Sequence, residues 1–228
     1  MSETLDRLCR VLGYTFRDPD LLTRALTHRS AGPNNYERLE FLGDGLINFV
    51  VAEAIYRACP EAGEGDLSRL RASLVREESL AVLAEKLQLG EVLVMGPGEL
   101  KSGGFRRHSI LADTLEALLG AVYLDGGFEH AHAVCLKLFA EPLAQLPDPA
   151  QLKDPKTRLQ EFLQGRGRPL PQYELSSAEG PPHRQLFTIN CLLTDGVETA
   201  HGQAASRKNA EQDAAEKMLA IIDRSGNA

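Results

Sequence analysis

Two short segments of the chain carry acidic residues at spacings that a helix brings to one side. In residues 36–45, Glu37, Glu40 and Asp44 fall within an arc of about 60° if each residue turns the helix by about 100°. The opposite side of this helix is apolar: Leu39, Leu42, Leu46, Phe49 and Val50. Like charges at this spacing destabilise a helix. We therefore expect the apolar face to be buried and the acidic strip to bind a divalent cation.

The second segment, residues 113–122, repeats this pattern with Asp113 and Glu116 on one strip. Its far side is again apolar: Leu115, Leu118, Leu119 and Val122. Gly120 occupies the angular position that Asp44 holds in the first helix, and it leaves room for another helix or a ligand. Two facing acidic strips would form an all-oxygen site suited to Mg²⁺ or Mn²⁺. On spacing alone, solvated helix surface remains an open alternative for these acids.

Helical periodicity dominates residues 5–145, and no strand is predicted there. The predicted helices are 5–12, 20–27, 37–57, 66–88, 109–124 and 128–143. Turn sequences containing Gly, Pro and Asn separate them. Asp66 is the predicted N-cap of the fourth helix.

The pattern changes after residues 142–155, which contain four prolines and are expected to form a linker. Beyond them, the predicted elements are a helix at 155–164, strands at 171–177, 185–194 and 197–204, and a helix at 206–222. This order, helix, three strands, helix, is typical of a small α+β module. We therefore predict an all-α domain followed by an α-β-β-β-α domain.

Composition places the 228-residue chain among ordinary globular proteins, with 43% hydrophobic and 25% charged residues. No apolar run approaches the ~18 residues of a membrane span, so no membrane partner is expected. The N-terminal residues lack the pattern of a signal peptide. Four scattered cysteines favour reduced thiols over zinc or disulfides, so we expect a cytoplasmic protein.

Net charge argues against nucleic acid as a partner, because the chain carries −7 overall. Residues 154–223 contain eight Lys or Arg and ten Asp or Glu, a balance of −2. The placement of charge points the other way. Arg207 and Lys208 open the last predicted helix, where the positive end of the helix dipole adds to attraction for phosphate.

Several motifs together resemble the ribonuclease III family. The first is Glu-Arg-Leu-Glu-Phe-Leu-Gly-Asp at 37–44, and it is accompanied by matching stretches at 26–30, 96–104 and 110–120. The tail resembles a double-stranded RNA-binding domain at 156–164, 180–183 and 206–215. The resemblance implies a nuclease domain at 5–127, a final helix and linker at 128–153, and an RNA-binding domain at 154–223.

The family resemblance implies an endonuclease that cuts double-stranded RNA with Mg²⁺, or with Mn²⁺ as a substitute. The products would carry 5′-phosphate and 3′-hydroxyl ends. The protein would act as a homodimer and process ribosomal RNA stems and other structured RNA precursors. Recognition would follow the shape and backbone of the duplex, because A-form RNA hides its base edges in a narrow groove.

The resemblance also assigns roles to individual residues. Glu40, Asp113 and Glu116 would ligate the metal, with Glu116 and Asp44 catalytic and Asp44 acting through water or as an orienting group. Glu37 and Glu64 would be supporting acids. The residues expected to contact RNA are Lys101, Gln160, His183, Arg207 and Lys208.

Three other positions need an interpretation. For His28, we favour a structural hydrogen bond near a helix end over a role as general base. Gly45 stands where the family motif commonly has serine, and we expect a modest loss of helix stability there. Glu211 stands where the RNA-binding pattern usually has a basic residue, which puts the strength of the phosphate contact in question.

Two other functions are compatible with these residues. One is a dimeric RNA-binding protein whose acidic site is idle, although all four inner carboxylates are present. The other is a metal-dependent phosphohydrolase of small substrates, which would not need residues 154–223. Cleavage of long duplex RNA, with and without those residues, separates the three hypotheses.

Overall fold

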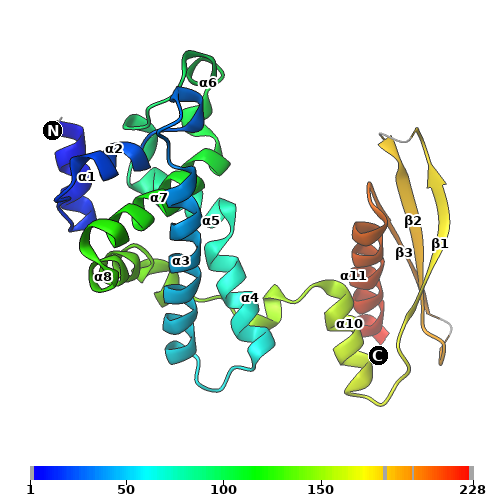
Figure 1. The fold of residues 1–228 in the computed structure, drawn as a ribbon. Coiled ribbons are helices and arrows are strands. Elements are labelled where there is room, and N and C mark those ends of the chain that lie inside the picture. The colour runs from blue at the N-terminus through cyan, green and yellow to red at the C-terminus, as the bar shows by residue number, and fades with distance from the viewer. Residues whose placement is uncertain (1–2, 182–183, 197, 226–228) are drawn as a thin grey trace. The chain divides into compact units, whose positions relative to one another are not determined.

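The computed structural model describes residues 3–181, 184–196 and 198–225. The chain divides into two compact units, residues 1–149 and 150–228 (Figure 1). The first unit is built from helices, and the second combines helices with a three-stranded sheet. This is the fold class that the sequence predicts, an all-α unit followed by an α-β-β-β-α unit.

In the helical unit the elements are α1 (Glu3–Leu12), α2 (Pro19–Ala25), α3 (Glu37–Ala58), α4 (Glu64–Val75), α5 (Glu77–Lys86), α6 (Pro97–Lys101), α7 (His108–Gly126), α8 (Phe128–Leu138) and α9 (Ala140–Ala144). Single 3-10 turns at Arg29–Ala31, Leu89–Glu91 and Gly104–Arg106 connect some of them. The residues predicted as a linker, 142–155, contain the end of α9 and a further 3-10 turn at Pro149–Leu152.

Helix α7 is the central element of this unit. Its leucines at 115, 118 and 119 are fully buried, as the sequence pattern predicts. Helix α3 packs along α7 in Figure 1, and α5 and α8 also contact it. The acidic segments of the sequence therefore lie on two neighbouring helices.

Three local predictions for this unit are wrong. The single helix expected at 128–143 is two helices, α8 and α9, which are separated at Phe139. The single helix expected at 66–88 is two helices, because Arg76 adopts an extended conformation with φ −67° and ψ 156° between α4 and α5. Asp66 is not the N-cap of α4, which begins at Glu64 after Gly63. Asp66 instead lies in the first turn and pairs with Arg69, with 2.6 Å between Oδ1 and Nη2.

The second unit consists of α10 (Pro155–Gln164), β1 (Gln172–Glu179), β2 (Leu186–Leu192), β3 (Thr199–Ala204) and α11 (Arg207–Ser225). The strands form an antiparallel sheet in the order β1-β2-β3. Strand β3 begins two residues later than predicted, and residue 197 lies outside the described residues. Asp154 caps α10 by accepting a hydrogen bond from the backbone N–H of Thr157.

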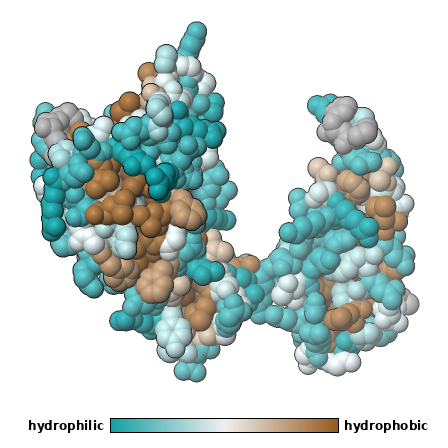
Figure 2. Space-filling model, in the orientation of Figure 1, coloured by the Kyte–Doolittle hydropathy of each residue, from teal (hydrophilic) through white to brown (hydrophobic). Residues whose placement is uncertain are grey.

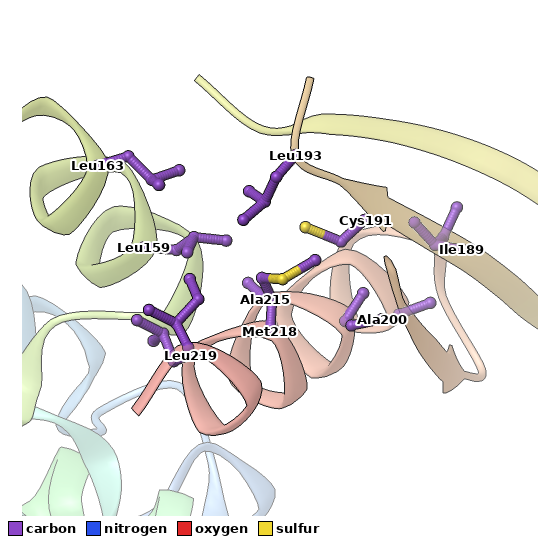
Figure 3. Packing of buried hydrophobic residues seen from close by; sticks show 12 residues of the cluster. Leu159, Leu163, Ile189, Cys191, Leu193, Ala200, Ala215, Met218 and Leu219 are labelled. Atoms are coloured by element: carbon purple, nitrogen blue, oxygen red, sulfur yellow. The ribbon is translucent and has the colours of Figure 1, made fainter. Parts of the chain in front are cut away.

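Figure 3 shows how the core of the second unit is filled from both helices and the sheet. Leu159 and Leu163 reach it from α10, Ile189 and Cys191 from β2, and Met218 from α11, all fully buried. A β-carbon at Gly202 would overlap backbone atoms of α11, so the absence of a side chain lets the sheet approach that helix closely. This packing fixes the exposed start of α11 relative to α10.

Candidate active site

Close packing of α3 against α7 places the two acidic strips beside each other. A β-carbon at Gly43 would overlap the backbone carbonyl of Glu116, and one at Gly120 would overlap that of Leu39. The two helices therefore pack with their backbones nearly in contact, which only glycine allows at these points. Gly120 makes room for the other helix, one of the two occupants that the sequence left open.

Three carboxylates converge where these helices meet. Glu40 projects from α3, and Asp113 and Glu116 project from α7. One oxygen from each carboxylate lies within 4.8 Å of an oxygen from each of the others. Within the described residues, no lysine or arginine forms an ion pair with these three groups. An all-oxygen, negatively charged set of this kind suits a hard divalent cation.

Burial and mutual repulsion disfavour the charged forms of these acids. Burial, followed by the charges of Asp44, Asp113 and Glu40, raises the pKa of Glu116 to about 8. Burial, followed by the charge of Asp113 and of nearby acids, raises the pKa of Glu40 to about 7. The pKa of Asp113 is also raised, mainly by burial. Carboxylates in this state gain most from a bound cation.

A polar cavity of about 440 Å³ opens beside the cluster. Glu40 and Asp113 line it together with Glu37 on α3 and with three charged groups from other elements: Arg29, Glu99 and Arg107. Arg107 pairs with Glu99, with 2.9 Å between Nη1 and Oε1, and Arg29 lies 3.6 Å from a carboxylate oxygen of Glu37. Both signs of charge are thus present in the cavity beside the acidic cluster. Acidic groups there can hold a cation, and basic groups can contact a polyanion.

Each of the two units matches a known protein family. A ribonuclease-III-like family model matches residues 18–143, and a double-stranded RNA binding motif matches residues 155–222. A relative named ribonuclease 3 from Alkalilimnicola ehrlichii is 56% identical, with 98% of each chain covered. Another from Nitrosococcus oceani is 52% identical, with 97% of this chain and 96% of that protein covered.

The chain belongs to the ribonuclease III family. Members of this family are metal-dependent, double-strand-specific endoribonucleases, and this chain is one of them. Two structures of the ribonuclease III nuclease domain from Campylobacter jejuni share its fold. One has a TM-score of 0.61 and 42% identity, covering 64% of this chain and all of that one. The other has a TM-score of 0.59 and 44% identity, covering 60% and 96%.

The remaining predicted acids lie around the cluster rather than in it. Asp44 is exposed one turn after Glu40, and its Oδ1 accepts a hydrogen bond from Asn48 at 2.8 Å. Its charge still contributes to the raised pKa of Glu116. Glu37 is exposed on the adjoining cavity. Glu64 opens α4 and lines a separate, mainly apolar pocket with Phe49.

Two other positions of the nuclease unit can now be placed. His28 is buried and caps a 3-10 turn, where its Nδ1 bonds with the Ser30 hydroxyl at 2.7 Å. This is the structural hydrogen bond that we favoured from the sequence. Gly45 faces open space, since a β-carbon there would have no neighbour within 4 Å. The helix therefore does not require glycine at position 45.

The residues predicted to bind RNA are exposed wherever the structure describes them. Lys101 ends α6, and Gln160 lies on α10. Arg207 and Lys208 form the first turn of α11, as predicted. His183 lies outside the described residues. Exposure leaves these groups accessible to a phosphate backbone.

Sequence reasoning missed a charge network in the RNA-binding unit. Glu211 accepts from Lys156 on α10 at 2.7 Å and from Arg207 at 3.2 Å, and thus joins two basic groups. Lys156 also lies over the ring of Tyr173, 4.4 Å from its centroid. The only sequence signal was Glu211 itself, an acid in a basic motif. The structure shows that this acid holds its basic neighbours together.

An exposed apolar surface covers parts of α3, α7 and α8, where Figure 2 shows hydrophobic side chains gathered. Phe41 is 82% exposed and Phe49 is 59% exposed, although the sequence pattern placed Phe49 on the buried face. With Tyr123 and Phe128 they line a pocket of about 390 Å³ that Asp44 and Gly45 also reach. No helix among the described residues has the length and hydrophobicity to cross a bilayer.

Proposed function

We propose that Glu40, Asp113 and Glu116 hold a Mg²⁺ ion that this enzyme uses to hydrolyse double-stranded RNA, with Mn²⁺ as a possible substitute. The observation that carries the proposal is the convergence of three carboxylates within 4.8 Å. Their raised pKa values support it, because they mark groups whose charge lacks a compensating partner. When bound, the cation supplies a Lewis acid that activates water and stabilises charge on the phosphate.

The protein groups around the cation then orient the reacting strand. Asp44, one turn along α3 from Glu40, orients water at the edge of the cluster. Glu37 and Glu64 act as supporting acids further from it. Water attacks phosphorus in line with the departing 3′ oxygen, which leaves a 3′-hydroxyl and a 5′-phosphate. Lys101 at the end of α6 contacts the RNA backbone.

The RNA-binding unit holds the duplex by its backbone. Gln160 on α10 reaches ribose hydroxyls, while Arg207 and Lys208 meet phosphate at the start of α11. This mode reads shape rather than sequence. The natural substrates are therefore structured stems, and we propose precursors of ribosomal and messenger RNA among them.

A homodimer is part of the proposed enzyme, and the apolar surface around Phe41 is its interface. One Campylobacter jejuni structure is described as showing flexibility in a region involved in dimer formation of the nuclease domain. A phenylalanine exposed to 82% beside an apolar pocket fits a contact between two copies of the chain. We expect Phe41→Asp to give monomers in sedimentation equilibrium, and Val82→Asp on α5 to remain dimeric. A dimeric Phe41→Asp variant would exclude this surface.

One assay tests the catalytic proposal directly. Wild-type protein and Glu116→Ala are incubated with duplex or single-stranded RNA, with and without Mg²⁺. We expect only wild type with Mg²⁺ and duplex to give fragments, while the variant retains duplex binding in a gel-shift assay. Cleavage by Glu116→Ala at the wild-type rate would refute the assigned role.

A further inference from the structure

Tyr36 is a buried residue that joins the acidic cluster without being an acid. It immediately precedes α3 and is only 2% exposed. Its hydroxyl donates a hydrogen bond across to α7, reaching Oδ2 of Asp113 at 3.4 Å. Its backbone carbonyl accepts from the N–H of Glu40 at 2.9 Å. One residue therefore contacts both helices that supply the cluster.

The ring of Tyr36 is held in place from a second direction. The His28 ring meets it edge-on, with 5.7 Å between centroids and 68° between planes. His28 is bonded in turn to Ser30, whose Oγ accepts from the backbone N–H of Gly96 at 2.9 Å. A β-carbon at Gly96 would overlap the carbonyl of Ser30, so this contact between segments is close. The Tyr36 side chain is therefore held by Asp113 at its hydroxyl and by His28 at its ring.

We propose that Tyr36 is a positioning residue for the metal site, because its hydroxyl holds Asp113 in the orientation that ligates the cation. A carboxylate has two oxygens, so the one bonded to the phenol fixes the rotamer and the other remains for the cation. A neutral donor favours the charged form of Asp113. It does so without adding a positive charge that would repel a metal ion. The inference rests on the proposed metal-binding role of Asp113.

The same unit contains a similar tyrosine–aspartate pair at the C-terminal end of α7. Tyr14 is also buried, and its hydroxyl donates to Oδ2 of Asp125 at 2.6 Å. Asp125 also accepts from the backbone N–H groups of Arg17 and Asp18, so this carboxylate is fully engaged in structure. Tyr14→Phe therefore removes a buried phenol–carboxylate bond of the same kind at a distant place. It measures the purely structural cost.

The test measures Mn²⁺ binding to full-length protein without RNA, by electron paramagnetic resonance, and the Mg²⁺ dependence of duplex cleavage. We expect Tyr36→Phe to raise the Mn²⁺ dissociation constant and the half-saturating Mg²⁺ concentration about tenfold. This is the lower end of the range of losses seen when a residue that orients a metal ligand is replaced. Cleavage at saturating Mg²⁺ should stay within about twofold of wild type. Tyr14→Phe should leave both metal constants unchanged while lowering the melting temperature.

Equal Mn²⁺ affinity in Tyr36→Phe and wild type would overturn the proposal. If Tyr36→Phe does not fold, Ser30→Ala replaces it, since that change keeps Tyr36 and removes the hydroxyl that bonds to His28 and accepts from Gly96. A weaker Mn²⁺ affinity in Ser30→Ala then supports the proposal, and an unchanged one overturns it. Failure of wild type itself to bind Mn²⁺ would instead refute the metal site, so the two hypotheses fail separately.

Discussion

Glu116 in the nuclease unit and Glu211 in the RNA-binding unit are both half-buried glutamates, yet their pKa values are shifted in opposite directions. Burial and neighbouring acids raise the pKa of Glu116 to about 8. Hydrogen bonds from Lys156, and then from Arg207, hold the pKa of Glu211 below its usual value against the effect of burial. One acid is surrounded by like charge, and the other by its counterions.

This difference shows how the same side chain serves two tasks. In the nuclease unit, like charges are held together by the packing of α3 on α7, and their repulsion is relieved either by a bound cation or by protonation. In the RNA-binding unit, the acids organise basic side chains. Asp213 likewise accepts from Lys217 at 2.7 Å. The negative total charge therefore conceals two different uses of carboxylates, which explains why it misleads about RNA binding.

The largest expected effect separates the two kinds of acid by function. Asp113→Asn removes a proposed ligand of the cation, and we expect single-turnover cleavage of duplex RNA to fall by at least about 10³-fold. Duplex binding in a gel-shift assay should remain within about twofold, because the RNA-binding unit is unchanged. Asp20→Asn, an exposed acid on α2, is the control and should cut normally. Cleavage by Asp113→Asn within tenfold of wild type would contradict the site.

Stability without metal should depend on pH in a direction set by the nuclease acids. Glu40 and Glu116 have a reference pKa of 4.5, against about 7 and about 8 in the folded protein. The folded state thus binds more protons than the unfolded chain between these values, so stability falls as pH rises from about 4.5 to 8. Below pH 4.5 the stability that these two acids contribute is fully present, and above pH 8 it is lost.

Urea denaturation with a metal chelator present, at pH 5 and at pH 8, measures this decline in the free energy of unfolding. We expect the decline to be smaller in Glu116→Gln than in wild type, by on the order of 1–2 kcal/mol after allowance for solvent screening. Glu211→Gln is the matched contrast, because the lowered pKa of Glu211 gives stability that is present above its unfolded pKa and lost as pH falls. It should therefore destabilise the protein about equally at both pH values, leaving the decline unchanged. An equally steep decline in Glu116→Gln would argue against the repulsion.

Metal binding should act on one unit only. At pH 8, we expect Mg²⁺ to slow amide hydrogen exchange in α3 and α7, because relieving the repulsion stabilises the contact between them. Exchange in α10 and α11 should not change, since acids of these helices already have cationic partners: Glu161, Glu211, Asp213 and Glu216. The effect in α7 should disappear in Asp113→Asn. Equal protection of both units would show that Mg²⁺ acts by general screening.

The sequence predicted the acidic strips correctly because helical periodicity is a local property. The spacing of Glu40 on one segment, and of Asp113 and Glu116 on the other, determines which side of each helix they occupy. Buried leucines on the far side of α7 then orient the strip. Periodicity does not reveal that α3 and α7 are neighbours. That followed from the family resemblance, and its physical basis is the close approach at Gly43 and Gly120.

The features that sequence reasoning missed depend on neighbours distant in the chain. Tyr36 reads as an apolar residue before a helix, and only the fold brings its hydroxyl to Asp113. Phe49 has the periodicity of a buried residue but stays 59% exposed, although the ring of Phe128 meets it edge-on. The break at Arg76 interrupts a continuous helical pattern. Here tertiary packing overrides local preference.

The smallest expected effect concerns Glu211, whose pairing with Lys156 and Arg207 offsets part of their positive charge. Glu211→Gln releases both basic groups toward phosphate, so we expect duplex binding about two- to fivefold tighter at low salt, with a steeper loss of affinity as salt rises. Glu174→Gln, an exposed acid on β1, makes the same change in net charge and should alter affinity less. Weaker binding by Glu211→Gln would mean that the carboxylate positions the basic side chains more than it neutralises them. Equal gains in the two variants would reduce the effect to net charge.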